Sequence, residues 1–260
     1  MIKIFTFLFI IFLFSIDCYA ENKIEVGVDE KLGNYLPLNI YFFDEDSNYV
    51  LLSDLFNKPT VLAFVYYECP GICSPLLQSI AEVVDNSDLV LGVDYNIVVV
   101  SMDETELPYQ AIKRKNAIIE LMDKNIPLRS WNFLTGDLRS IRSLSDAAGF
   151  YFKREGKDFR HAGCLIFTDS NGKITRYLFP GYSQRHGFGI LPFDFKIAVF
   201  EASESKVTPT IARVLQFCFS YDPAGRTYVL NLTRIFGVII ILFLIMFFIY
   251  IKLKPKNVSG

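Results

Sequence analysis

A continuous apolar segment that leads directly into an amphipathic helical pattern most restricts the folds open to this chain. Residues 59–67, PTVLAFVYY, form an apolar run interrupted by no charge, which suits a strand buried on both faces of a sheet. The next apolar side chains recur at helical spacing, at Leu76, Leu77, Ile80, Val83 and Val84. A buried strand followed by such a helix indicates an α/β domain.

The later segments continue this alternation. Residues 94–101, DYNIVVVS, predict a second strand, and residues 108–123 show a helix-like pattern of apolar side chains among Lys and Arg. Residues 163–168 and 173–179 predict two strands joined at Asn171-Gly172, a hairpin signal. The order β-α-β-α-β-β indicates parallel strands closed by an antiparallel hairpin. We therefore expect a thioredoxin-like α/β fold, a mixed central sheet flanked by helices, although spacing alone leaves other α/β folds open.

The first twenty residues have the composition of a signal peptide. Lys3 precedes a run of 13 uncharged residues, 4–16, and Cys18 and Ala20 are small residues at the −3 and −1 positions of a cleavage site. An uncleaved anchor is the alternative, but 13 helical residues rise only about 20 Å, short of the ~30 Å hydrocarbon core. We expect residues 1–20 to be removed.

The other end predicts a membrane anchor. Residues 235–251, IFGVIIILFLIMFFIYI, are uncharged, and with their flanks they predict one transmembrane helix at 233–252. The lysines at its end favour a cytoplasmic tail, residues 253–260. Residues 21–231 then form an extracytoplasmic domain. The N-terminus contains no Arg, unlike a mitochondrial transit peptide, so we expect a single-pass protein of the bacterial inner membrane whose main domain faces the periplasm.

Charge excludes one class of partner. Residues 21–231 hold 21 basic and 27 acidic side chains, a net charge of about −6. Nucleic-acid binding depends on Lys and Arg contacts to phosphates, so no nucleic-acid partner is expected. Aromatic residues make up 15% of the chain, which argues against intrinsic disorder.

A cysteine pair lies between the first buried strand and its helix. Cys69 and Cys73 belong to the sequence ECPGIC, at the predicted start of the helix. The helix dipole and free backbone N–H groups there favour thiolate. The i, i+4 spacing places both sulfurs on one side of the first turn. The pair could form a redox-active or structural disulfide, or bind one soft metal ion.

A metal held by two thiolates needs a third ligand, and the chain has only two histidines. His161 directly precedes the predicted strand 163–168, whereas His186 lies in a glycine-flanked loop. Two further cysteines leave alternatives open. Cys164 is expected to be a buried core thiol or to pair with Cys218, and Cys218 could instead be a membrane-proximal ligand.

Asp103 and Met102, which follow the second predicted strand, are expected to have structural roles. Asp103 is expected to cap the following helix, with Glu106 in its first turn, rather than to act as a catalytic acid. Met102 is expected in the core rather than as a thioether ligand of a metal ion.

Four motifs together resemble the Sco/SenC family. They are residues 67–75 (YECPGICSP), 101–105 (SMDET), 131–137 (WNFLTGD) and 160–163 (RHAG), within a resemblance that spans approximately residues 30–180. The CPxxC element with a lone His 88 residues after the second Cys is fairly specific. Residues 218–228 and the terminal apolar helix resemble a bacterial branch of the family with a C-terminal anchor. Phe159-Arg160 departs from the acidic-polar approach to the His in better-known members.

The resemblance implies a thioredoxin-like copper metallochaperone of cytochrome c oxidase assembly. It implies Cys69, Cys73 and His161 as metal ligands. Two thiolates and an imidazole suit Cu(I), with Cu(II) as an alternative, whereas zinc normally seeks a fourth ligand. The implied partner is the oxidase subunit that carries the dinuclear CuA site, with an upstream copper donor or thiol reductant as a further partner.

A rival interpretation is a redox enzyme. Cys69 could act as the nucleophile of a thiol–disulfide oxidoreductase that reduces the copper-ligand cysteines of the oxidase or other extracytoplasmic disulfides. A peroxide reductase is a weaker third option. The sequence does not separate a chaperone from an enzyme.

Overall fold

The centre of the protein is a five-stranded mixed sheet. The computed structural model describes residues 25–183, 187–209, 219–222, 227–230, 240, 243–247 and 249–250. The strand order is β11-β10-β4-β5-β6, and the bounds are Thr60–Val65 (β4), Asn96–Ser101 (β5), Trp131–Leu134 (β6), Leu165–Thr168 (β10) and Ile174–Leu178 (β11). β4, β5 and β6 are parallel, whereas β10 runs antiparallel to both β4 and β11.

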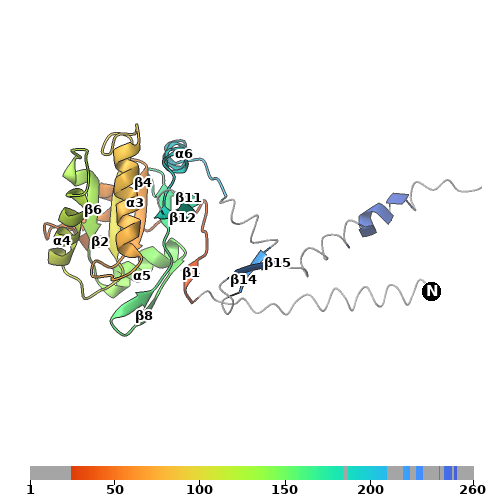
Figure 1. Ribbon diagram of the computed structural model, residues 1–260, viewed down its shortest axis with the longest axis horizontal. Helices are drawn as coiled ribbons and strands as arrows, with labels where there is room; N and C mark the ends of the chain where they lie inside the picture. Colours follow the sequence, from red (N-terminus) through yellow and green to blue (C-terminus); the bar gives the residue numbers. More distant parts are fainter. Residues whose placement is uncertain are drawn as a thin grey trace, which may run out of the picture.

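Four helices of ten residues or more accompany the sheet in the described part. Their bounds are Cys73–Asn86 (α3), Pro108–Ile119 (α4), Leu138–Ala147 (α5) and Pro192–Ser203 (α6). Figure 1 shows α3 lying along the sheet between α4 and α6, and α3 contacts both of these helices. Two short helices, α2 (Leu52–Leu55) and η1 (Leu128–Ser130), lie between the strands of the same domain.

In the part of the chain that the structure describes, five antiparallel strand pairs lie outside the central sheet. They are β1 (Gly27–Val28) with β7 (Phe150–Tyr151), β2 (Tyr41–Phe43) with β3 (Tyr49–Leu51), β8 (Lys153–Glu155) with β9 (Asp158–Arg160), β12 (Gly181–Ser183) with β13 (Gly187–Gly189), and β14 (Phe219–Asp222) with β15 (Thr227–Leu230). The hairpin β8–β9 ends directly before His161, so it determines where that side chain lies.

The core explains the continuous apolar run in the sequence. Every residue of β4 and β5 is buried, because neighbouring strands and packed helices cover both faces. Trp131, Phe64 and Phe167 are among the largest fully buried side chains. The apolar face of α3 is buried as its spacing predicted, including Leu76, Leu77 and Ile80.

The predicted mixed α/β fold is confirmed, with two additions. The order of elements predicted from the sequence lacked β6 and α5, which add one more strand and one more helix before the closing hairpin. The prediction that Asp103 caps a helix is wrong, since α4 begins at Pro108 with Leu107 at its N-cap. Pro108 fixes this start, because proline suits the first helical position and restrains the residue before it.

Most residues at the two ends of the chain lie outside those that the structure describes. The predicted signal peptide, residues 1–20, lies outside the described residues, as do His186 and Cys218. Within the described residues, no helix combines the length and apolar composition needed to cross a membrane. Much of the predicted span 233–252 lies outside them.

Candidate metal centre

The loop between β4 and α3 brings Cys69 back over the start of the helix. The Cys69 N–H donates to the carbonyl of Tyr66 at 3.3 Å, which closes a turn. The Gly71 N–H then donates to Cys69 Sγ at 3.3 Å. Because α3 begins at Cys73, its first residue carries the second sulfur. The loop therefore presents both cysteines at one helix N-terminus, as the sequence spacing predicted.

The structure brings Cys69, Cys73 and His161 together. One ligand atom from each lies within 4.8 Å of the other two. The Cys73 Sγ atom lies 3.4 Å from His161 Nε2. Cys73 is fully buried and Cys69 is 6% exposed, whereas His161 is partly exposed. Among the residues that the structure describes, no other Cys, His, Asp or Glu joins this group.

The histidine ring is oriented for coordination through Nε2. His161 Nδ1 lies 2.8 Å from the carbonyl oxygen of Ala162. A carbonyl only accepts, so Nδ1 carries the hydrogen, and in the neutral ring the lone pair is on Nε2, facing Cys73. The ring packs against Tyr66 at 6.1 Å and Phe150 at 6.4 Å between centroids. These contacts restrict its rotation.

The surroundings of the two thiols shift their pKa values in opposite directions. A hydrogen bond from Cys73 lowers the pKa of Cys69, and interactions with His161 and the Gly71 N–H lower it further against the opposing effect of burial. The same hydrogen bond to Cys69, together with burial, raises the pKa of Cys73. These opposite shifts favour a thiolate at Cys69 and a protonated thiol at Cys73.

A buried carboxylate holds the backbone that enters this loop. Glu106 accepts hydrogen bonds from the N–H groups of Tyr67 and Glu68, each at 2.8 Å. The Ser101 hydroxyl donates to the same carboxylate at 2.6 Å. Burial raises the pKa of Glu106. The sequence pattern placed this residue in a helical turn, and it missed the role because the contacts are 38 and 39 residues away along the chain.

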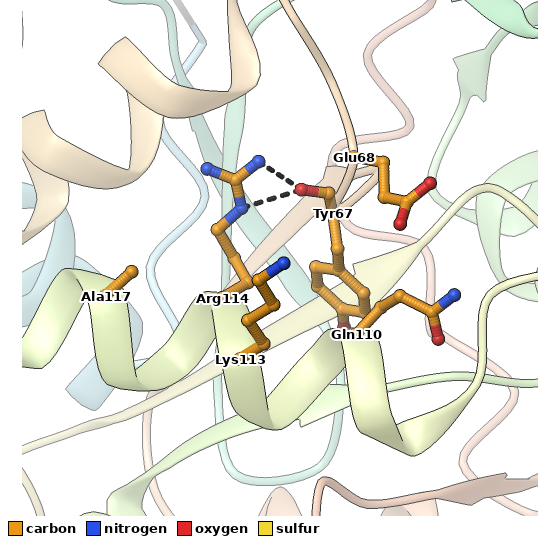
Figure 2. A pocket seen from close by; sticks show the side chains of 6 residues that line it. All are labelled: Tyr67, Glu68, Gln110, Lys113, Arg114 and Ala117. Carbon is orange, nitrogen blue, oxygen red and sulfur yellow. Dashed lines mark hydrogen bonds between the residues drawn. The ribbon is translucent and has the colours of Figure 1, made fainter.

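An arginine on α4 joins both ends of the loop. Arg114 donates to the Tyr67 carbonyl through Nε at 2.8 Å and through Nη2, as Figure 2 shows. Its Nη1 donates to Ser74 Oγ at 2.9 Å, in the first turn of α3. The adjoining groove, about 260 Å³, is lined by Tyr67, Glu68, Gln110, Lys113, Arg114 and Ala117. The guanidinium therefore fixes the chain just before Cys69 and just after Cys73.

The histidine arm is held by a second arginine. Arg154 of β8 donates to Asp103 at 2.6 Å and to Glu104 at 2.9 Å. Its guanidinium also lies 4.4 Å above the ring of Phe159 on β9. These contacts fasten the hairpin β8–β9 to the end of β5. Asp103, expected as a helix cap, instead anchors the hairpin that ends at His161.

The remaining candidates lie in the core. Cys164 is 1% exposed, and burial raises its pKa, as expected for an unreactive core thiol. Cys69, Cys73 and Cys164 are free cysteines. Met102 is fully buried, in agreement with its predicted core position. The donor set of the centre is thus two sulfurs and one imidazole nitrogen, a soft set suited to Cu(I).

Comparisons with solved structures found proteins that are similar to this chain. A putative electron transfer protein from Aquifex aeolicus is 20% identical, with a TM-score of 0.58 over 68% of this chain and 96% of its own. BsSco, described as a member of the Sco family of cytochrome c oxidase assembly proteins, is 20% identical, with a TM-score of 0.51 over 68% of this chain and 99% of its own. Arabidopsis thaliana ScoI with copper bound is 20% identical, with a TM-score of 0.49 over 62% and 96%.

The comparison with family models identifies the chain more directly. No curated protein sequence matches it. The SCO1/SenC family model matches residues 40–188, more than half of the chain. This segment includes the whole central sheet, both cysteines and the histidine. The chain therefore belongs to the SCO1/SenC family.

Proposed function

We propose that this protein binds one Cu(I) ion through Cys69, Cys73 and His161 and delivers it to the dinuclear copper site of cytochrome c oxidase. The observation that carries the proposal is the meeting of three ligand atoms within 4.8 Å at a helix N-terminus. Membership of the SCO1/SenC family supports it, as does the description of BsSco as belonging to a family of cytochrome c oxidase assembly proteins.

The geometry suits a cargo that must be released. Two thiolates and one imidazole satisfy Cu(I), which tolerates three ligands, and such a site leaves one side open to an incoming ligand. His161 is the most exposed of the three residues. An incoming thiolate or imidazole from an acceptor protein could replace the ligands one at a time, so the ion would never be free in solution.

Copper binding would be coupled to the redox state of the cysteines. Oxidation of the Cys69 thiolate and the Cys73 thiol to a disulfide removes two electrons and the proton that Cys73 holds, and it leaves no thiolate for the metal. The protein would then need an extracytoplasmic thiol reductant before an upstream copper donor could load it. The close approach of Cys69 and Cys73 at one helix turn supports both the disulfide state and the copper-binding state.

A second function, thiol–disulfide exchange, is favoured by the lowered pKa of Cys69. The Cys69 thiolate would attack a substrate disulfide, forming a mixed disulfide and releasing one substrate thiolate. Cys73, after losing its proton, would then attack the Cys69 sulfur and release the second substrate thiolate. The copper-ligand cysteines of the oxidase are the proposed substrate. Reducing them and then loading them would be consecutive tasks of one site.

The location belongs to the same proposal. The apolar N-terminal segment, the uncharged run at 235–251 and the lysines after it support a domain that faces the periplasm, held by one helix in the bacterial inner membrane.

A Cu(I) titration tests the proposal. Full-length protein, reduced and kept anaerobic in detergent, is titrated against a coloured Cu(I) chelator alongside Cys69→Ser and His161→Ala. The matched control is His186→Ala, which removes the only other histidine. We expect one tight copper per chain for wild type and control, and at least tenfold weaker binding for the other two. Equal binding by all four proteins would refute the site, and weak binding by wild type with Cys69-dependent disulfide reduction would assign the second function.

A further inference from the structure

Helix α6 carries large apolar side chains on its inner and its outer face, and the outer face is open. The inner face packs in the core through Phe195, Ala198 and Ala202. On the outside, Phe193 is 72% exposed and Phe200 is 59% exposed. A helix that is apolar on both faces is normally covered on both. Large apolar side chains gathered on an outer face therefore indicate a surface that another apolar phase covers.

The exposed side chains form a stripe along the helix. Phe193 and Phe200 are seven residues apart, about two turns, so they point in the same direction roughly 10 Å from each other. Leu191, the N-cap residue, is 58% exposed and lies at the same end of the helix as Phe193. We call these three residues the α6 stripe. A stripe parallel to the helix axis suits a flat apolar surface better than a deep pocket.

The chain itself brings the α6 stripe close to the predicted membrane helix. Only 23 residues, 210–232, separate Pro209 from residue 233. Within them, β14 and β15 pair Phe219 with Leu230, so that hairpin returns the chain to its own start. The remaining linker, residues 210–218 and 231–232, spans at most about 40 Å when extended. An anchored domain therefore holds Pro209, six residues past the end of α6, within this reach of residue 233.

The α6 stripe also lies at the end of the domain away from the metal centre. Lys196 of α6 forms an ion pair with Asp88, just past the end of α3, whereas Cys73 begins that helix. Figure 1 shows α6 beside one end of α3 and β8 beyond the other. Beside the stripe, Lys196 pairs with Asp88 and Glu201 pairs with Arg176, whereas Asp194 in the first turn of α6 adds an acidic charge, so no excess of positive charge lies on this face. Apolar contact rather than charge would therefore attract this face to its partner.

We propose that the α6 stripe inserts into the interfacial layer of the bilayer in which the predicted helix 233–252 is anchored, and so orients the domain with its metal centre facing away from the lipid. The inference rests on the anchor included in the proposed function. A tether makes contact between the stripe and the lipid an intramolecular event, so two Phe and one Leu suffice where a free domain would bind weakly. The fixed orientation would present Cys69 and His161 to soluble domains of membrane-bound partners.

Lipid quenching of an introduced tryptophan tests this orientation. Full-length Phe200→Trp is reconstituted into vesicles of phosphatidylethanolamine and phosphatidylglycerol, with or without brominated acyl chains. The matched control is Tyr109→Trp on α4, a residue that is 69% exposed. Both variants share the buried Trp131 as background. We expect brominated lipid to quench the added fluorescence of Phe200→Trp at least twofold, independently of salt, and to leave that of Tyr109→Trp unchanged.

Every other outcome overturns the inference. Equal, weak quenching at both positions means that the stripe does not touch lipid. Protection of position 200 from aqueous acrylamide without lipid quenching means that protein covers the stripe, either a second copy or residues 210–218. Failure of the chain to enter vesicles removes the anchor on which the inference rests. The Cu(I) titration on the same samples keeps these results separate from the copper proposal.

Discussion

At the scale of single residues, the centre depends on how two sulfurs divide one proton. Cys69 is stabilised as a thiolate by the Cys73 thiol, by His161 and by the Gly71 N–H, whereas Cys73 is buried and keeps its proton. When a metal ion replaces this proton, one of its ligands, the Cys69 thiolate, is already charged. Loading therefore releases about one proton, from Cys73, at neutral pH.

This division predicts the pH dependence of alkylation. The pKa of Cys69 is lowered from its ordinary value of 9.0. Its reaction with iodoacetamide, which requires thiolate, should therefore persist well below pH 9 and fall off only in acid. Cys73→Ala removes the stabilising donor, so the pH midpoint should rise. Mass spectrometry of the Cys69 peptide over a pH series measures both curves, and a wild-type midpoint at the ordinary thiol value would contradict the assigned thiolate.

The sequence predicted the metal ligands but not the residues that hold the ligand loop in place. Cys69 and Cys73 are visible because a short motif places both at a helix start, and His161 because histidine is so rare here. Glu106 and Arg114 carry no comparable signal. Their hydrogen bonds reach residues 38 to 47 positions away, and only the parallel pairing of β4 with β5 brings these segments together. Such contacts follow from topology, which no local spacing encodes.

At the scale of elements, the hairpin β8–β9 acts as the arm that carries His161. Arg154 fastens this arm to Asp103 and Glu104, and its guanidinium packs on Phe159. The ion pairs are partly exposed, with the Arg154 side chain 34% accessible, so their direct contribution to stability is small. Their main effect should be on where the histidine lies.

Arg154→Ala should therefore affect copper more than folding. We expect a loss of about 1 kcal/mol in the free energy of unfolding, from two partly exposed ion pairs and one cation–π contact. Cu(I) affinity should fall roughly threefold or more, and amide exchange should rise over residues 153–161. The matched control is Lys153→Ala, the neighbouring cation that pairs with the exposed Glu25. Unchanged copper affinity in Arg154→Ala would show that the arm is fixed by other contacts.

A buried ion pair joins three other elements. Lys115 of α4 pairs with Glu45, which follows β2, and donates to the Leu128 carbonyl at 2.7 Å. Glu45 also accepts from the Phe133 N–H on β6 at 2.9 Å. The two side chains are only 4% and 7% exposed. Removing one partner leaves a buried charge without its counterion, which is more costly than removing both.

Lys115→Met should lower the free energy of unfolding by about 3–5 kcal/mol. The double variant Lys115→Met/Glu45→Gln should recover most of this loss, because the Gln oxygen still accepts from the Phe133 N–H. Chemical denaturation of the four proteins in this cycle measures the coupling. Equal destabilisation by the single and the double variants would contradict the account of an unpaired carboxylate.

Elements with strong periodicity were predicted, and those between them were not. β4, α3 and β5 have long, uniform apolar patterns, and each pattern is compatible with few other secondary structures. The strand β6 is only four residues, and its polar Asn132 and neighbouring turn conceal it. Helix α5 is an exception, because the order predicted from the sequence lacks it although it has a clear apolar face with Ile141 and Leu144 buried. Asp103 has the composition of a helix cap, but Pro108 shifts the start of α4 and leaves the carboxylate to Arg154.

At the scale of the whole molecule, the sequence predicts an arrangement whose ends lie mostly outside the described residues. The central domain matches the predicted α/β fold because its apolar pattern was decisive. The signal peptide and the anchor rest on uncharged runs at the two ends of the chain. Since their composition is the evidence for them, their role stays a prediction.

Copper should stabilise the whole domain only when its cysteines are reduced. A ligand that binds the native state alone raises stability by mass action, by about 2.7 kcal/mol at a hundredfold excess over its Kd. The reduced, Cu(I)-loaded protein should therefore melt several degrees above the reduced apoprotein. Copper should leave the melting temperature of the oxidised protein unchanged. A Cu(I)-induced shift of equal size in oxidised protein would contradict a site made from two thiolates.

The ligand set itself is the central claim, and X-ray absorption spectroscopy at the copper edge measures it most directly. The reduced, full-length protein loaded with one Cu(I) should show two sulfur ligands and one nitrogen ligand, with the multiple scattering of an imidazole ring. His161→Ala should lose the imidazole signal and keep both sulfurs, whereas His186→Ala should match the wild type. A wild-type spectrum with no imidazole, or with three or more sulfur ligands, would contradict the centre formed by Cys69, Cys73 and His161.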